Sequence, residues 1–171
     1  VACSAVLLNA LSETEVEARE RDAVALVGYS LRKPLVASTR TERASSLEWL
    51  SRTLLNTTPA TSVHLIDADG CVACRAGVVG QGDDLDREAI DMGSRPILGK
   101  CLSQREEVYL PDLQILPGKV EFSYLPLNCQ SVMILPWDAT GAAVIATNKA
   151  KSLKLVDIAK IRASLAVAET L

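Results

Sequence analysis

The segment "SVHLIDADGCVACRAGVV", residues 62–79, alternates apolar and polar side chains on both sides of Asp69-Gly70. Such alternation is typical of β-strands, and Asp-Gly between two strands is a strong signal for a two-residue hairpin turn. We therefore predict an antiparallel hairpin in this segment. Counting outward from the turn gives the expected partners: Ala68 with Cys71, Leu65 with Cys74, and His64 with Arg75.

Two cysteines of this hairpin, Cys71 and Cys74, have the C-x-x-C spacing of redox enzymes and zinc sites. In the predicted strand they lie on opposite faces with Cα atoms about 10 Å apart, whereas a disulfide needs less than about 7 Å. Neither a disulfide nor a shared metal fits this geometry. Cys74 is expected to be a buried apolar residue on the face that carries these side chains: Val63, Leu65, Val72 and Ala76.

Three other uses of the cysteines require further conditions. Attachment of haem c needs a histidine after the second cysteine, where Arg75 stands. A thiol oxidoreductase, or a four-thiolate zinc site that adds Cys101 and Cys129, would require the predicted hairpin to be wrong.

His64 is the one histidine of the chain and lies opposite Arg75 in the expected register. The simplest interpretation is a strand residue at a partly hydrated surface. As an alternative, His64 and Arg75 face a cavity and bind an anionic ligand, which makes them weak pocket candidates. No neighbouring residues supply the acid, base and nucleophile that hydrolysis needs.

The remaining elements predict an α+β domain with an antiparallel sheet, helices grouped on one face, and a second face covered by a loop and short helices. A helix from about Thr41 carries Leu47, Leu50 and Leu54 at helical spacing, and "CQSVMILPW" and "GAAVIATN" form a second hairpin across "DATG". Residues 87–104 suggest short helices interrupted at Gly93 and Pro96, and "EEVYLPDL" a strand ended by Pro111. The closing helix, about 155–169, is expected to align one set of residues on one side: Leu155, Ile158, Ala159, Arg162, Leu165 and Ala166.

Residues 1–36 are predicted to be a helical segment preceding a domain of residues 37–171. Ser12 and Glu15 have capping-box spacing, and Gly28 is placed where a helix would stop. The first eleven residues carry no charge but are too few to span a bilayer, which needs roughly 20 residues. They are either the tail of a membrane helix that begins upstream of Val1 or a short helix end docked on the domain.

Composition excludes some classes of function. The chain has 18 basic and 21 acidic residues, a net charge of −3, and six aromatic residues: two Trp, three Tyr and one Phe. A nucleic-acid surface usually needs a basic face and stacking rings, so we expect no nucleic-acid partner. Five irregularly spaced cysteines without a secretory signal argue against a secreted disulfide framework.

The order of elements resembles the GAF domain family of small-molecule sensors and regulatory modules, from about Thr41 to Leu171. The residues that carry the resemblance are "VYLPDL", "CQSVMILPW", and "GAAVIATN" followed by a helix with Asp157 near its start. Members that bind cyclic nucleotides resemble this chain at Asn148, Lys149 and Asp157, but Leu153 and Ile158 replace their phenylalanine and glutamate. Cyclic nucleotide binding is therefore not expected, and no cysteine has the setting of bilin-binding relatives.

A narrower resemblance is to the proteins called cofactor assembly of complex C, found in chloroplasts and cyanobacteria. It rests on "ERDAVALVG", "LEWLSRTLLNTTPATSV" and "VYLPDLQILPGKVEFSYLP". The resemblance implies a non-catalytic factor of the thylakoid membrane, anchored upstream of Val1 and with its soluble domain in the stroma or the cyanobacterial equivalent. It implies assistance in covalent haem attachment to cytochrome b6 of the b6f complex, with haem as a transient client, cytochrome b6 as client protein, and a paralogue or a second copy as partner. The alternative is a GAF domain that senses a small ligand.

The segment "PDLQILPGKVEFSYLP" is predicted to carry specificity for a partner, because long irregular loops in compact domains are often functional. We expect the recognition residues to be Asp112, Pro117, Gly118, Glu121, Phe122 and Tyr124, with Glu121 exposed. The alternative is that Phe122 and Tyr124 fill the sheet face left open by the short helices.

Overall fold

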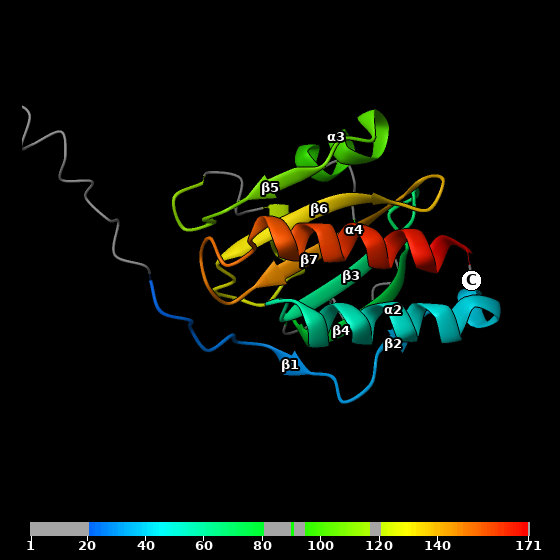
Figure 1. Cartoon of the computed structure of the whole chain (residues 1–171), viewed down its shortest axis with the longest axis horizontal. Helices are drawn as coiled ribbons and strands as arrows, with labels where there is room; N and C mark the ends of the chain where they lie inside the picture. Colours follow the sequence, from blue (N-terminus) through cyan, green and yellow to red (C-terminus); the bar gives the residue numbers. More distant parts are fainter. Residues whose placement is uncertain (1–20, 81–89, 91–94, 117–120, 171) are drawn as a thin grey trace, which may run out of the picture.

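A computed structural model describes residues 21–80, 90, 95–116 and 121–170 of the chain (Figure 1). The described elements, in chain order, are β1 (Tyr29–Ser30), β2 (Leu35–Val36), the 3-10 helix η1 (Ser38–Arg43), α2 (Ala44–Thr57), β3 (Ser62–Ile66), β4 (Val72–Val79), α3 (Pro96–Gln104), β5 (Val108–Leu110), β6 (Ser131–Trp137), β7 (Gly141–Thr147) and α4 (Leu155–Thr170). Seven strands form one antiparallel sheet in the order β1-β4-β3-β7-β6-β5, and β2 also pairs with β4. Helices α2 and α4 lie side by side on one face, and α3 with the neighbouring loops covers the other. The predicted α+β class is therefore confirmed.

The predicted 62–79 hairpin is formed by β3 and β4. Its register contains two of the expected pairs, His64 with Arg75 and Leu65 with Cys74. One step nearer the turn, Ile66 pairs with Val72, so that Ala73 is an extra residue on the β4 side. This β-bulge shifts the register by one residue, as insertion of an unpaired residue must.

The turn of this hairpin is longer than predicted. The N–H of Asp67 donates to the carbonyl of Cys71 at 2.8 Å, and Gly70 has a φ of +80°. The expected pairing of Ala68 with Cys71 is wrong because the bulge displaces it. The bulge also moves Val72, expected beside Cys74, to the other face of the sheet.

The helix layer buries one face of the sheet. Leu47, Leu50 and Leu54 of α2 point inward as predicted and are at most 2% exposed. In α4 the buried residues are Asp157, Ile161, Leu165 and Ala168, so the predicted inward side is wrong except at Leu165. Leu155, expected inward, is 87% exposed. Apolar residues occur all around α4, so its periodicity does not single out the side that packs.

The second face is covered by α3 and the 121–129 loop. Pro96 begins α3 and does not interrupt it, because a proline at the first helical position loses no intrahelical hydrogen bond. Leu98 and Cys101 of α3 pack with Val132 and Ile134 of β6 in a second buried cluster. The short-helix cover predicted for this face is confirmed.

Residues 21–36 differ from the predicted helical segment. Residues 21–26 are not helical, Val27 forms a bridge with Leu127, and β1 and β2 add two short strands to the sheet edge. Gly28 lies so close to β4 that a Cβ atom there would be 2.1 Å from the Val79 carbonyl oxygen. The expected helix stop at Gly28 is therefore a close approach of backbones, whereas Ser12 and Glu15 lie outside the described residues. Of the helices described, none is long and apolar enough to cross a bilayer.

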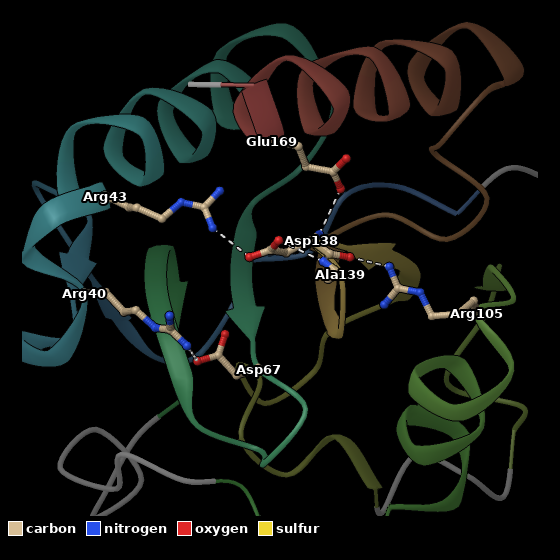
Figure 2. Close-up of polar contacts among 7 residues, drawn as sticks. All are labelled: Arg40, Arg43, Asp67, Arg105, Asp138, Ala139 and Glu169. Carbon is tan, nitrogen blue, oxygen red and sulfur yellow. Dashed lines mark hydrogen bonds and ion pairs between the residues drawn. The ribbon is translucent and has the colours of Figure 1, made fainter.

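Asp138, in the turn between β6 and β7, connects this end of the sheet to the helices (Figure 2). Its carboxylate accepts from the Arg43 guanidinium at 2.6 Å, and its backbone N–H donates to the Glu169 carboxylate at 2.9 Å. Arg105 donates to the carbonyl oxygens of Asp138 and Gly141. The turn thus links the start of α2, the end of α4 and the residue that follows α3.

An Asp138→Asn variant is expected to change how stability depends on pH. Hydrogen bonds and the Arg43 charge lower the pKa of Asp138 below 3.8, so its contribution is complete above about pH 5 and is lost as the pH falls below 4. The side chain is 39% exposed and screened by solvent, so the contribution is below about 1 kcal/mol. Urea unfolding from pH 7 to pH 3 should show a difference between wild type and variant that shrinks below pH 4. Asp69→Asn, in an exposed turn, is the control, and an equal pH effect in both variants would contradict the prediction.

Candidate functional site

The sequence-predicted site residues that the structure describes lie on the second face of the sheet. His64 of β3 and Arg75 of β4 face the 121–129 loop, and the loop supplies Phe122 and Tyr124. All four residues are at most 8% exposed. The fold therefore brings together the predicted pocket pair and the predicted recognition aromatics, which are about fifty residues apart in the sequence.

His64 is 2% exposed, so the expectation of a partly hydrated surface residue is wrong. Burial, assisted by the positive charge of Arg75, lowers its pKa to about 3, and the imidazole is neutral at physiological pH. Its Nε2 lies 3.2 Å from the Ser62 hydroxyl, and its ring meets the Tyr124 ring edge-on at 5.5 Å. Covered in this way, His64 is not accessible to an acceptor or metal outside the domain.

Tyr124 and Phe122 fill the space above the strands. The ring of Tyr124 is covered by the Arg95 guanidinium at 4.7 Å, a cation–π distance, and lies 6.3 Å from the ring of Phe122. Burial raises the pKa of Tyr124 well above its usual value. Arg95 was not a predicted site residue, and no local sequence signal distinguishes it, because the stacking depends on a loop 26 residues further along the chain.

Glu121 is half-buried, so the expectation of an exposed carboxylate is wrong. Its Oε2 accepts from the backbone N–H of Ile97 at 2.8 Å in the first turn of α3, where unpaired N–H groups favour a negative charge. Its carbonyl oxygen accepts from Arg95. Glu121 thus joins the loop to α3, and its replacement by alanine would remove a helix cap worth about 1 kcal/mol.

Asp112 is 6% exposed and is held by the domain itself. Its Oδ1 accepts from the backbone N–H of Gln114 at 3.0 Å, and its Oδ2 pairs with Arg21 at 2.9 Å. Pro117 and Gly118 lie outside the described residues.

Three polar atoms of this region have no hydrogen-bond partner among the described residues: Nδ1 of His64, the hydroxyl of Tyr124 and Nε of Arg95. Buried polar groups usually have partners, so these atoms mark the part of the second face that has hydrogen-bonding capacity to spare. A separate hollow of about 460 Å³ lies beside it and is mainly apolar, with Leu113, Phe122, Leu125, Pro126, Leu127 and Cys129 among its lining residues.

The described cysteines do not form a reactive pair. Cys71 is exposed, and Cys74 is buried beside the Ser51 hydroxyl at 3.2 Å, which confirms that they occupy opposite sides of the strand. Burial raises the pKa of Cys74 and of Cys101 to about 11, so both are protonated thiols at neutral pH. Within the described ranges, no group of three or more His, Cys, Asp or Glu side chains is placed to hold a metal.

Comparison with known proteins identifies the family. The sequence matches the family described as cofactor assembly of complex C, CCB2/CCB4, over residues 1–168. The chain belongs to this family. The CCB2/CCB4 family is named for cofactor assembly of complex C, the cytochrome b6f complex. None of the curated proteins compared with the chain matches it.

Solved structures similar to this CCB2/CCB4 member are GAF-like. A GAF domain/HD domain protein from Geobacter sulfurreducens is 20% identical with a TM-score of 0.60, covering 78% of this chain and 93% of that one. The type II free methionine-R-sulfoxide reductase from Thermoplasma acidophilum is 16% identical with a TM-score of 0.59, covering 77% and 92%. The GAF domain from Acinetobacter phosphoenolpyruvate-protein phosphotransferase is 13% identical with a TM-score of 0.54, covering 75% and 80%. At these identities the similarity shows the fold alone, and that fold is the GAF-like one predicted from the sequence.

Thiol alkylation should distinguish the four described cysteines of this CCB2/CCB4 member. At pH 7.5 iodoacetamide is expected to modify Cys71 in the native protein, while Cys74, Cys101 and Cys129 react only in denaturant because they are buried. Peptide mass spectrometry gives the modified fraction at each position, and Cys71→Ser is the control for peptide assignment. Modification of native Cys74 as fast as Cys71 would contradict the structure of this strand.

Proposed function

We propose that this chain is a non-catalytic assembly factor that aids covalent haem attachment to cytochrome b6 of the b6f complex through protein–protein contacts. The observation that carries the proposal is the family match over residues 1–168. The proposed setting is the thylakoid membrane of a chloroplast, or its cyanobacterial equivalent, with the described domain on the stromal side. A membrane segment upstream of Val1 is the proposed anchor.

The chemistry of the second face supports a role without catalysis by its own side chains. His64 is buried and neutral, and Cys74 and Cys101 are protonated. A general base or a nucleophile needs access to its substrate and a pKa near the working pH. Haem is therefore proposed as a client that passes between partners, with cytochrome b6 as the client protein.

The outer surface of α2 and α4 is the proposed contact with a second copy or a paralogous assembly factor. Trp49 of α2 is 41% exposed, and Val156 and Val167 of α4 are 58% and 46% exposed. The two valines are eleven residues apart, which places them on one side of a helix with 3.6 residues per turn. Exposed apolar side chains gathered on adjacent helices are typical of protein interfaces.

The 111–126 loop remains a proposed second contact, with a division of roles among its residues. Glu121, Phe122 and Tyr124 are bound into the domain and would act by holding the loop in place. Asp112 would hold its other end. Pro117 and Gly118 are the residues proposed to meet a partner.

The main proposal is tested in a photosynthetic host by removing the chain and measuring haem that stays on cytochrome b6 through denaturing electrophoresis. We expect this covalent haem to be lost and to return when the intact chain is restored. Other haem proteins of the same membrane serve as controls. Unchanged covalent haem on cytochrome b6 would contradict the proposal.

A double variant, Val156→Glu with Val167→Glu, should separate association from folding. The charges are expected to weaken self-association or pairing with a paralogue at least about tenfold, because two carboxylates would be desolvated in an apolar contact. Stability should change by about 0.5 kcal/mol or less per exposed site. Sedimentation measures association, and Ser103→Glu with Gln104→Glu on the exposed end of α3 adds the same charge elsewhere. Equal association of both variants would remove this surface from the proposal.

A small-ligand-sensing GAF domain is the second candidate function. It is favoured by the unpartnered polar atoms of His64, Tyr124 and Arg95 and by the nearby charge of Arg75, which together suit a small anion. A soluble ligand that raises the melting temperature of wild type, and of a His64→Phe variant much less, would support sensing. If phosphate, carboxylates and nucleotides leave the melting temperature unchanged, the sensor function is rejected.

A further inference from the structure

A second hollow lies at the opposite edge of the molecule from α3, outside the region discussed above. Strands β1 and β2 both pair with β4, but residues 31–34 between them bow away from the sheet edge toward solvent (Figure 1). The gap between this segment and α2 is a hollow of about 380 Å³. This volume lies within the range of small-molecule sites.

The hollow combines an apolar interior with a cationic rim. Leu31, Leu55 and Ala76 are among the apolar residues that line it. Arg32 and Lys33 come from the 31–34 segment, and Arg52 comes from α2. Three cationic side chains from two separate elements therefore border one small apolar space.

The charge of this rim is not neutralised within the described part of the chain. Arg52 has a single distant partner, the Glu48 carboxylate at 3.4 Å. Neither Arg32 nor Lys33 makes an ion pair or side-chain hydrogen bond with another described residue, whereas every other described arginine has a partner. Because the whole chain has a net charge of −3, this concentration of unpaired positive charge is exceptional for the molecule.

We infer that the hollow between residues 31–34 and α2 binds an amphiphilic anion, a phosphate or carboxylate group on a short alkyl body. The anionic group would lie among Arg32, Lys33 and Arg52, and the alkyl part would contact Leu31, Leu55 and Ala76. Charge-assisted hydrogen bonds hold the first part and burial of apolar area favours the second. The site is distinct from the second sheet face, and it does not depend on the proposed role in haem attachment.

A free molecule and a membrane lipid present the same chemistry to this hollow. A bilayer surface attracts a protein by the sum of many basic residues, at about 1 kcal/mol each, and repels a domain of net negative charge. The three cations here border a hollow of molecular size. The structure therefore assigns the site to a single anionic group with its own alkyl chain, whether that molecule is free or drawn from a bilayer.

The test uses the 171-residue chain, hexyl phosphate and amide NMR at physiological salt. Hexyl phosphate should bind with a dissociation constant on the order of 1 mM, and shifts should map to residues 31–34, 52–56 and 76–77. Inorganic phosphate should bind at least about tenfold more weakly because it lacks the alkyl contact. Hexanol, which lacks the charge, should bind weakly too.

Variants separate this site from general electrostatic attraction. Arg32→Gln with Lys33→Gln should weaken hexyl phosphate binding about tenfold or more and leave the unfolding midpoint nearly unchanged, because both side chains are exposed. Lys100→Gln with Arg162→Gln removes the same charge at the other sheet edge and should leave binding unchanged. Equal losses in the two double variants, or shifts that map to the 121–129 hollow, would overturn the inference.

Vesicles distinguish the source of the ligand. Co-sedimentation with vesicles containing phosphatidylglycerol, lost in Arg32→Gln with Lys33→Gln, would identify a lipid as the source. Binding of free hexyl phosphate without vesicle binding would identify a soluble amphiphile. Failure of both would overturn the inference and leave the cations available to carboxylates of a protein partner.

Discussion

Strand β7 has no face that water reaches, and this constraint governs the rest of the structure. All of its residues are buried, and those from Ala142 to Ala146 are completely so. It lies between β3 and β6, which hydrogen-bond to its two edges. A strand paired on both edges and apolar on both faces is stable only if each face is covered by a separate layer. One layer is therefore the pair α2 and α4, and the other is α3 with the 121–129 loop.

Covering the second face has a chemical consequence. Phe122 and Tyr124 occupy the space above the strands, so His64 is buried among them and remains neutral. The thiols of Cys74 and Cys101 are kept protonated by the same removal from water. The side chains most often used for catalysis thus serve packing here, and the surfaces left for recognition are the outer helix layer, the loop and the cationic hollow. A GAF-like scaffold with these properties suits a factor that brings other proteins together.

The ends of the strands are fixed by polar contacts that complement the apolar layers. Arg43 also lies 5.8 Å from the centre of the Trp137 ring, so it connects the start of α2 to both the charge and the aromatic side chain of the β6–β7 end. Arg40 pairs with Asp67 at the neighbouring β3–β4 turn (Figure 2). Because successive arginines of η1 reach the two turns, the helix layer has one position along the sheet.

The sequence by itself determined the two hairpins, the helix of Leu47, Leu50 and Leu54, the short strand before Pro111 and the GAF-like order of elements. These features depend on contacts between residues close in the chain, for which alternation, helical spacing and turn residues are direct signals. Tertiary structure decided the bulge at Ala73, the inward side of α4, the strands in place of a helix around Gly28, and the burial of His64 and Glu121. In each case the deciding partner is far away in sequence: α2 for α4, β4 for residues 28–36, and the 121–129 loop for His64. Local pattern carries no information about such a partner, because the free energy of burial depends on which surfaces meet when the whole chain folds.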